Sequence, residues 1–117
     1  MVQEVAVNHD GMQYGVELYG NEIVFYRVEK DESGFASGGT DDDIIYNYSI
    51  TGDVTRSVAL YRKIAMAVQT IIYSEGLHYY TFNVDDEKRA AIYERFAEKV
   101  GGYRAVHTGD YFYLYKQ

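Results

Sequence analysis

Hydrophobic and polar residues alternate through the opening part of the chain. Tyr14, Val16 and Leu18 occupy every second position, and the residues between them are mostly polar. A period of two is typical of a strand that buries one face. Asp-Gly and Gly-Asn pairs separate the alternating segments and indicate tight turns. The pattern therefore predicts an antiparallel meander of three strands: Val2–Val7, Gln13–Tyr19 and Glu22–Glu29.

The alternation stops between Lys30 and Asp43, a segment rich in glycine, serine and aspartate. We predict a mobile loop here, serving either as a solvated connection or as a flap over a cleft. Its run of three aspartates could attract a cationic partner. It is a weak metal signal, because consecutive side chains of an extended segment point to opposite faces. A fourth strand is expected at Ile44–Thr51, where alternation resumes.

A long helix is predicted after this strand. Asp53 or Thr55 can cap its start, its apolar positions continue to about Ser74, and Gly76 ends it. Its polar residues form one narrow stripe, and apolar residues cover most of the remaining surface. A helix of this kind is buried between other elements. We therefore expect it to be the central packing helix.

The last third of the chain predicts a strand, a helix and two strands. The helix starts with acidic residues, which its positive end favours, and a glycine pair stops it. Apolar residues recur along it at helical spacing, which predicts one buried face. The expected bounds are Leu77–Val84 for the strand, 85–100 for the helix, and Tyr103–His107 and Tyr111–Lys116 for the closing hairpin.

Composition narrows the class of protein. The 117 residues suit one domain, 1–117, and the absence of cysteine excludes disulfides and thiolate metal sites. The net charge of −7 argues against nucleic-acid binding. The three histidines lack the spacing of a metal site, and we expect no bound metal. Neither a signal peptide nor an apolar run of membrane-spanning length is present, so a cytoplasmic protein is expected.

The predicted strand–helix–strand unit resembles the C-terminal half of the GNAT acyltransferase fold. In that family the helix carries a pattern like Asn-x-x-Ala-x-x-Leu-Tyr and is followed by Gly-Phe. Here Asp86 stands in place of the Asn, Ile92 of the Leu and Tyr93 of the Tyr, and Gly102-Tyr103 replaces Gly-Phe. The resemblance implies an α+β fold with a mixed, mostly antiparallel sheet and the order β-β-β-β-α-β-α-β-β. One helix would be long and buried and the other amphipathic.

The resemblance also implies a cofactor, acetyl-CoA or another acyl-CoA. The family binds its pyrophosphate at the start of the long helix, on a loop with spaced glycines. The corresponding residues here are Val54, Thr55, Arg56 and Ser57, and the spaced glycines are missing. Asp53 would also bring a negative charge towards the phosphates. Thr55, Arg56 and Ser57 could still donate hydrogen bonds to a phosphate, or the segment could be an ordinary capped helix start.

Tyr93 is the candidate catalytic residue. A tyrosine at this position of a GNAT helix often protonates the leaving CoA thiolate, and a positioned phenol can act as an acid. The alternative is that Tyr93 is a core aromatic on the apolar face. A general base could be Glu22, Asp43 or His78, and the sequence does not select one.

Three functions stay open at this stage. The first is a divergent GNAT-like module that binds a ligand or partner without acyl transfer. The second is a working N-acyltransferase with a non-consensus loop, and the third is an unrelated α+β interaction protein. The family arrangement requires a parallel strand pair between Ile44–Thr51 and Leu77–Val84, splayed apart beside the cofactor. Tyrosine-rich strands favour a protein partner or a homodimer in all three cases.

Overall fold

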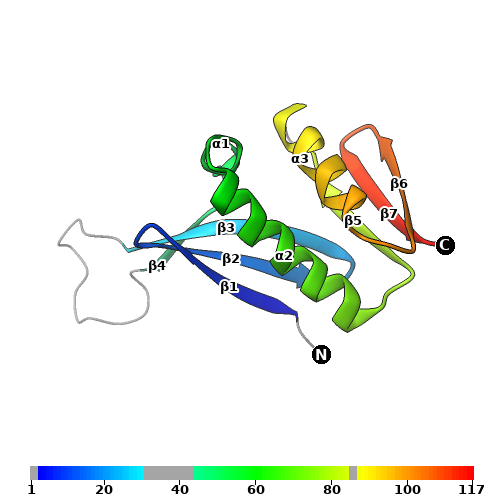
Figure 1. Ribbon diagram of the computed structural model, residues 1–117, viewed down its shortest axis with the longest axis horizontal. Helices are drawn as coiled ribbons and strands as arrows, with labels where there is room; N and C mark the ends of the chain where they lie inside the picture. Colours follow the sequence, from blue (N-terminus) through cyan, green and yellow to red (C-terminus); the bar gives the residue numbers. More distant parts are fainter. Residues whose placement is uncertain (1–2, 31–43, 85–86) are drawn as a thin grey trace.

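A computed structural model describes residues 3–30, 44–84 and 87–117 (Figure 1). Almost all of the predicted loop Lys30–Asp43 and the acidic pair at 85–86 lie outside these residues. The described strands are β1 (Glu4–His9), β2 (Met12–Tyr19), β3 (Glu22–Lys30), β4 (Ile44–Asn47), β5 (Tyr79–Asn83), β6 (Tyr103–Thr108) and β7 (Tyr111–Lys116). The described helices are α1 (Thr51–Arg56), α2 (Val58–Glu75) and α3 (Glu87–Glu98).

The strands form one sheet in the order β1-β2-β3-β5-β7-β6. Strand β4 pairs with the C-terminal end of β3, and β5 pairs with the N-terminal end of β3. The β3–β5 pair, Glu22 with Thr81, is parallel, and the other described pairs are antiparallel. The prediction of an α+β fold with a mixed, mostly antiparallel sheet is therefore confirmed. Confirmation at this level does not extend to the GNAT arrangement.

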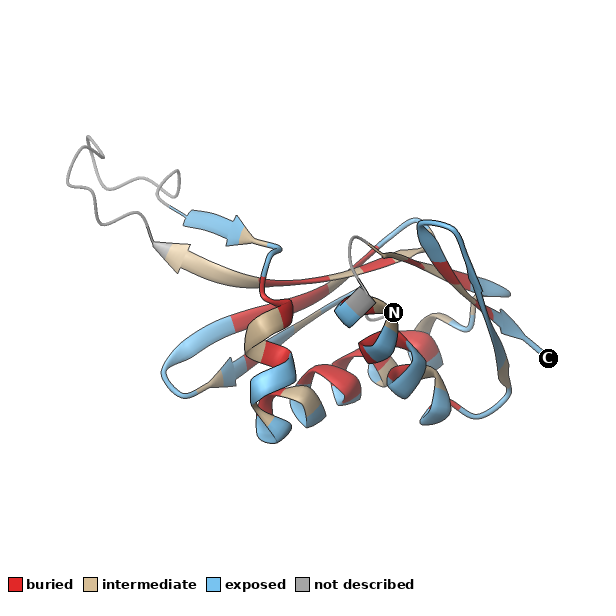
Figure 2. Ribbon diagram, turned by 90° about the horizontal axis from the view of Figure 1, so that it is seen from above, coloured by how far each residue is buried: buried red, intermediate tan, exposed pale blue. Residues whose placement is uncertain are grey.

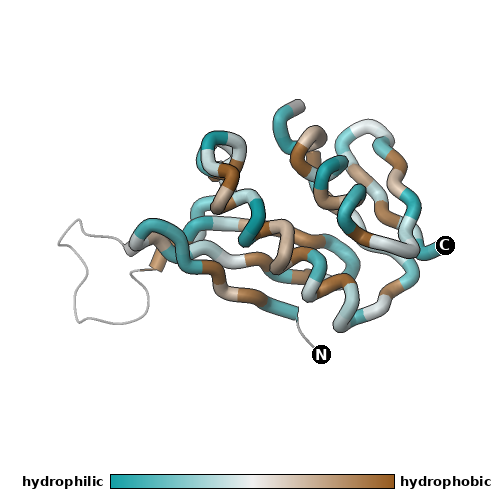
Figure 3. Tube along the Cα trace, in the orientation of Figure 1, coloured by the Kyte–Doolittle hydropathy of each residue, from teal (hydrophilic) through white to brown (hydrophobic). Residues whose placement is uncertain are grey.

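All three helices cover the same face of the sheet (Figure 2). Buried residues line the contact between the two layers, among them Val16, Phe25, Ile64 and Phe82. Hydrophobic positions recur along the strands and along α2 and α3, as the colours of Figure 3 show. The opposite face of the sheet carries no described helix, and we call it the open face.

The opening meander agrees with the prediction. Tyr14, Val16 and Leu18 are buried on the helix side of β2. Strand β1 starts and ends two residues later than predicted, because its register pairs Glu4 with Glu17 and His9 with Met12. Each turn of the meander places a residue in the left-handed region, which is where glycine is favoured, and Gly11 and Gly20 hold φ values of 77° and 61°.

The prediction of a strand at Ile44–Thr51 is wrong in its second half. Strand β4 ends at Asn47, and Thr51 already belongs to α1. Ile50 is buried because it precedes the helix and points into the core, not because it continues the alternation. The expected parallel pairing of this segment with Leu77–Val84 is wrong as well. Among the described strands, β5 takes β3 as its parallel partner instead.

The predicted single long helix is two helices. Ser57 lies between α1 and α2 with extended backbone angles, φ −123° and ψ 110°. Its hydroxyl accepts the backbone N–H of Leu60, so Ser57 caps α2 and the predicted caps at Asp53 and Thr55 are wrong. Gly76 ends the helix as predicted.

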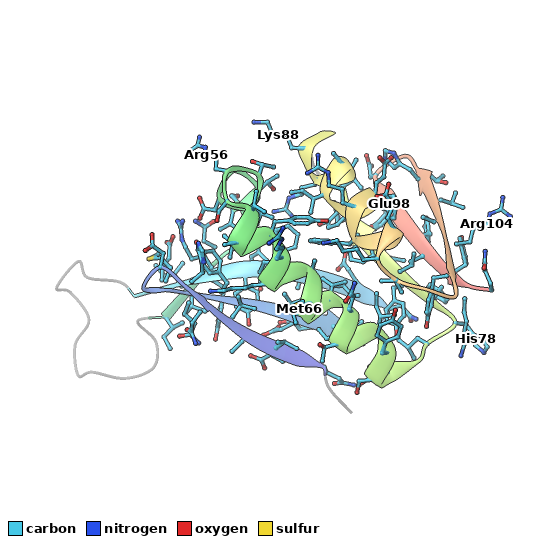
Figure 4. The ribbon with its side chains drawn as sticks, in the orientation of Figure 1. Arg56, Met66, His78, Lys88, Glu98 and Arg104 are labelled. Atoms are coloured by element: carbon cyan, nitrogen blue, oxygen red, sulfur yellow. The ribbon has the colours of Figure 1, made fainter. Side chains whose placement is uncertain are left out.

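Helix α2 is less buried than predicted. It packs one side on the sheet, and Val58, Met66 and Tyr73 remain exposed on its outer side (Figure 4 labels Met66). None of the described helices is long and apolar enough to cross a membrane.

Candidate functional site

A groove of about 470 Å³ lies between the helices on the outer surface of the helical layer. The end of α1, the first turns of α2 and one side of α3 form its walls. Its size is in the range of pockets that bind small molecules. The lining residues are Val54, Thr55, Val58, Tyr61, Arg62, Lys88, Ala91, Ile92, Arg95 and Lys99.

The residues predicted to bind the cofactor divide into two pairs. Val54 and Thr55 line the groove, the first buried and the second exposed. Arg56 ends α1 and projects into solvent, and Figure 4 shows it at the same end of the molecule as Lys88. Ser57 does not line the groove, because its hydroxyl caps α2. The structure therefore brings only half of this predicted set to a common site.

Four cationic side chains line the groove, and none of its lining residues is acidic. Lys88 and Arg95 come from one side of α3, Lys99 follows the end of that helix, and Arg62 comes from α2. The two salt bridges found among the described residues involve neither these lysines nor these arginines. The groove is therefore a locally basic site on a chain with a net charge of −7.

Helix α3 segregates its charges. Its cations at Lys88 and Arg95 face the groove, whereas Glu94 and Glu98 line a shallower depression against β6 and β7. Figure 4 shows Glu98 on the β6 side of the helix. The acids Glu94 and Glu98 therefore line a different depression from the cations Lys88 and Arg95.

Tyr61 has a buried hydroxyl that finds no hydrogen-bond partner among the described residues. Its ring stacks on Phe96 with centroids 5.5 Å apart, and the Lys99 ammonium lies 4.8 Å from its centroid. Burial raises the pKa of the Tyr61 phenol, so the hydroxyl keeps its proton and remains a donor. Buried hydroxyls in proteins are nearly always hydrogen-bonded. The hydroxyl is closed to solvent, so a ligand in the groove can supply an acceptor only when the Tyr61 side chain turns towards it.

Asp53, which the sequence suggested would repel a phosphate, is held by other groups. The Arg27 guanidinium donates to its Oδ2 at 2.6 Å, and the Tyr14 hydroxyl donates to the same oxygen at 3.3 Å. The same guanidinium bonds to Glu29, whose pKa it lowers together with a hydrogen bond from Asn47. Asp53 therefore ties α1 to the sheet, and it does not line the groove.

Tyr93 lies in the hydrophobic core, with 1% of its surface exposed. The rings of Phe82 and Phe25 lie 4.6 and 6.1 Å away. Its hydroxyl receives an Arg89 N–H at 3.5 Å. Tyr93 is not among the groove-lining residues, so the structure does not bring it together with Val54 and Thr55. Its role as a proton donor stays a prediction.

Arg89 is a buried cation that sequence reasoning did not single out. It is 8% exposed, its Nε donates to Thr51 Oγ1 at 2.9 Å, and an Nη donates to the carbonyl of Tyr48. Its guanidinium carbon lies 5.2 Å from the centroid of Phe25. These bonds connect α3 to the start of α1, and they give Arg89 a structural role.

His9, Ser57 and Lys63 approach one another in a second polar cluster. Ser57 Oγ lies 3.3 Å from His9 Nε2, and Lys63 Nζ lies 3.4 Å from His9 Nδ1. An ammonium only donates, so Nδ1 must accept and Nε2 must carry the proton. Nε2 therefore donates to Ser57 and has no lone pair for the serine proton. This geometry does not activate Ser57 as a nucleophile.

The remaining predicted groups do not reach the groove. Glu22 begins β3 and His78 precedes β5, and neither is a lining residue. Asp43 lies outside the described residues. Within the described ranges no group of three acidic, histidine or cysteine side chains is placed to hold a metal ion.

The groove contains residues that the sequence could have revealed. Lys88, Arg95 and Lys99 recur at spacings of seven and four, which places them on one side of a helix.

Comparison of the chain with protein-family models, curated proteins and solved structures found no match.

Proposed function

We propose that this chain is a cytoplasmic, non-catalytic binding domain whose helical groove holds an anionic ligand with an apolar part. The observation that carries the proposal is the lining of the groove, in which four cations and several apolar side chains surround Tyr61, whose buried hydroxyl lacks a partner among the described residues. An acyl-CoA is the ligand class that the family resemblance implies.

The charges select an anion. Arg62, Arg95 and Lys99 are exposed cations on two helices that face one groove. Like charges gathered on one surface repel one another, and an anionic ligand relieves that repulsion. Phosphate oxygens also accept hydrogen bonds, so they suit both the cations and the Tyr61 hydroxyl.

The apolar side chains in the groove favour a ligand that has an apolar part in addition to its charged part. Val58 is 67% exposed on the outer side of α2, and Ala91 is exposed on the facing side of α3. Apolar groups of a ligand would remove this surface from water at about 25 cal/mol for each Å². A CoA thioester joins phosphates to a less polar arm and fits both features.

The proposal is for binding without catalysis because of what lines the groove. Its lining residues include no carboxylate or imidazole that could take a proton from an acceptor amine. The proposed acid, Tyr93, lies in the core. Acyl transfer is therefore the alternative, and it requires a movement that brings Tyr93 to the groove.

Self-association is part of the proposal. Tyr79, Tyr111 and Tyr115 are each about 40% exposed on the open face. Exposed tyrosines of this kind are enriched at protein interfaces. Sedimentation of the wild-type chain and of a Tyr111→Ser, Tyr115→Ser variant measures it, and an unchanged monomer in both would contradict a homodimer.

Calorimetric titration with CoA, pantetheine and inorganic pyrophosphate tests the groove. We expect CoA to bind more tightly than either fragment, since only CoA supplies both charge and apolar surface. Arg95→Gln together with Lys99→Gln should weaken CoA by about tenfold or more, because each charged hydrogen bond contributes about 1.5–3 kcal/mol. Raising the salt concentration should weaken binding of the wild-type chain.

Arg104→Gln is the matched control, because Arg104 is an exposed arginine on β6 that does not line the groove. It should leave CoA binding unchanged. Absence of binding by all three compounds at millimolar concentration would overturn the anion groove. Binding of CoA and pyrophosphate with equal strength would remove the apolar part of the proposal. Turnover of acetyl-CoA that Tyr93→Phe abolishes would favour the enzyme instead.

A further inference from the structure

The open face has a second hollow, which we call the Gly15 pocket. It measures about 130 Å³ and crosses the first four strands of the sheet. A volume of about 30 Å³ for each liquid water makes it the size of a few waters or one small organic group. Its lining residues are Glu4, Ala6, Gln13, Tyr14, Gly15, Tyr26, Val28, Ile44 and Tyr46.

The strand register creates this pocket. Ala6, Gly15 and Tyr26 lie side by side on β1, β2 and β3, so two small residues adjoin one large ring. The ring of Tyr26 lies over Gly15, where an added Cβ would come within 2.5 Å of ring atoms. The small side chain of Ala6 leaves the space, and the Tyr26 ring, which covers Gly15, forms one wall of it.

Two aromatic rings meet at the pocket nearly at a right angle. The centroids of Tyr26 and Tyr46 lie 5.1 Å apart, and their planes differ by 88°. Tyr26 is buried, whereas Tyr46 is 51% exposed and accessible from solvent. Perpendicular rings of this kind form adjacent walls of the cages that surround ammonium groups in proteins.

The charge at the pocket is negative. Glu4 lines it, and the Tyr26 hydroxyl donates to Glu17 Oε1 at 2.6 Å and approaches Glu4 Oε1 at 3.5 Å. No lysine or arginine is among the lining residues. A phenol that donates to a carboxylate makes its own ring richer in electrons. Rings and carboxylates therefore favour the same class of ligand, a cation.

We propose that the Gly15 pocket binds a small organic cation, such as a methylated ammonium group. The ammonium lies against the exposed ring of Tyr46, beside the small part of the Tyr26 ring that remains accessible, and Glu4 supplies the opposite charge. Methyl groups fill the space above Ala6, beside the Tyr26 ring. This site is on the opposite side of the sheet from the helical groove, and it is independent of the function proposed for that groove.

Choline and dimethylbutanol, in which a tert-butyl group replaces the trimethylammonium, form a matched pair of probes. Titration followed by amide NMR should shift the signals of Gly15 and Tyr46 with choline. Binding of the uncharged isostere should be weaker by a few-fold to about thirtyfold, because a cation–π contact contributes about 0.5–2 kcal/mol. Equal affinity for the two compounds would overturn the proposal, as would the absence of shifts at Gly15.

Two variants test the walls of the pocket. Tyr46→Leu keeps an apolar side chain at an exposed position and should abolish the preference for choline over its isostere. Glu4→Gln keeps the shape and should weaken choline alone. Tyr73→Leu, at a comparably exposed tyrosine on α2, is the control and should bind choline like the wild-type chain. Retained preference in Tyr46→Leu would overturn the assignment of the site.

Discussion

Two sides of helix α3 have opposite characters, although both carry arginine. On the side that faces the sheet, which we call the packed side, Arg89 is buried and bonded to Thr51 and Tyr48. On the groove side, Arg95 is exposed and belongs to neither salt bridge of the described residues. The first arginine holds the helix in place, and the second is free to meet a ligand.

The difference shows how the same residue type takes a structural or a binding role. A buried cation must have its hydrogen bonds satisfied within the protein, since its desolvation is otherwise too costly. An exposed cation has water as its partner, and a ligand can replace that water. The contrast between the two sides of α3 can be measured with paired substitutions, because stability should follow one side and binding the other.

The largest effect is expected at Tyr93. Tyr93→Ala removes a ring that contacts Phe25, Phe82 and Phe112, and it should lower the free energy of unfolding by about 3–5 kcal/mol. Tyr93→Phe retains the ring and removes only the hydroxyl, so it should cost about 1 kcal/mol, the contribution of a typical hydrogen bond. Urea unfolding measures both. A loss in Tyr93→Phe as large as that in Tyr93→Ala would show that the hydroxyl, not the ring, holds the packed side.

The next largest change in stability is expected from substituting the two arginines of α3, Arg89 and Arg95. Arg89→Met should lower the free energy of unfolding by about 2–3 kcal/mol, because it leaves the Tyr48 carbonyl and the Thr51 hydroxyl without their donor. Arg95→Met should change it by no more than about 0.5 kcal/mol. Thermal and urea unfolding of the pair, together with CoA titration, measures both properties.

We expect each of the two variants to change a different property, stability or ligand affinity. Arg89→Met should lose stability, and Arg95→Met should lose ligand affinity at unchanged stability. Equal destabilisation by the two variants would remove the distinction between the packed side and the groove side. If the folded Arg89→Met variant lost as much affinity as Arg95→Met, the ligand would have to bind nearer to α1 than proposed.

Much of the fold could be predicted from local patterns. The alternation of Tyr14, Val16 and Leu18 gave a strand with the correct buried face, and Gly76 marked a helix end. The break at Ser57 was not predictable in the same way, because apolar residues continue on both sides of it. The period of two around Ile50 was misleading, since a residue preceding a helix can be buried without a strand.

The candidate site was predictable only in part. The helical spacing of Lys88, Arg95 and Lys99 can be seen in the sequence, but Arg62 joins them through the packing of α2 beside α3. Tyr61 and Tyr93 both lie at apolar helical positions, and periodicity cannot distinguish them. Only the packing shows that Tyr61 lines the groove and that Tyr93 does not.

Alkaline pH provides a further test of the packed interior. Burial raises the pKa of Tyr80 to about 12, from an ordinary value of 10. Between these two pH values the unfolded chain loses the proton and the folded chain keeps it, so stability must fall as pH rises. We expect this tyrosine to account for a decrease on the order of 2 kcal/mol between pH 9 and pH 12.

The matched variant for this test is Tyr80→Phe, which cannot ionise. Its free energy of unfolding should fall less steeply over the same pH range than that of the wild-type chain. Urea midpoints measured at several pH values compare the two. Parallel curves would mean that Tyr80 ionises equally in the folded and unfolded chains.

The smallest changes in stability are expected at neutral pH, when one of two buried tyrosine hydroxyls is removed. The Tyr80 hydroxyl donates to the Ile72 carbonyl and accepts the Leu77 N–H, each at 3.0 Å. Tyr80→Phe should therefore cost about 1–2 kcal/mol. Tyr61→Phe removes a hydroxyl that finds no partner among the described residues, so it should change stability by less than about 0.5 kcal/mol or raise it. Urea unfolding of the two variants measures this difference.

The same Tyr61→Phe variant should weaken CoA binding, because the hydroxyl has no partner in the free protein and gains one from the ligand when the side chain turns towards the groove. Tyr80→Phe, which changes a hydroxyl outside the groove, should leave the affinity of its folded fraction unchanged. A stability loss in Tyr61→Phe equal to that in Tyr80→Phe would mean that the Tyr61 hydroxyl already has a partner. The groove would then lose the feature that most favours a ligand, and its cations alone would give only weak, salt-sensitive attraction.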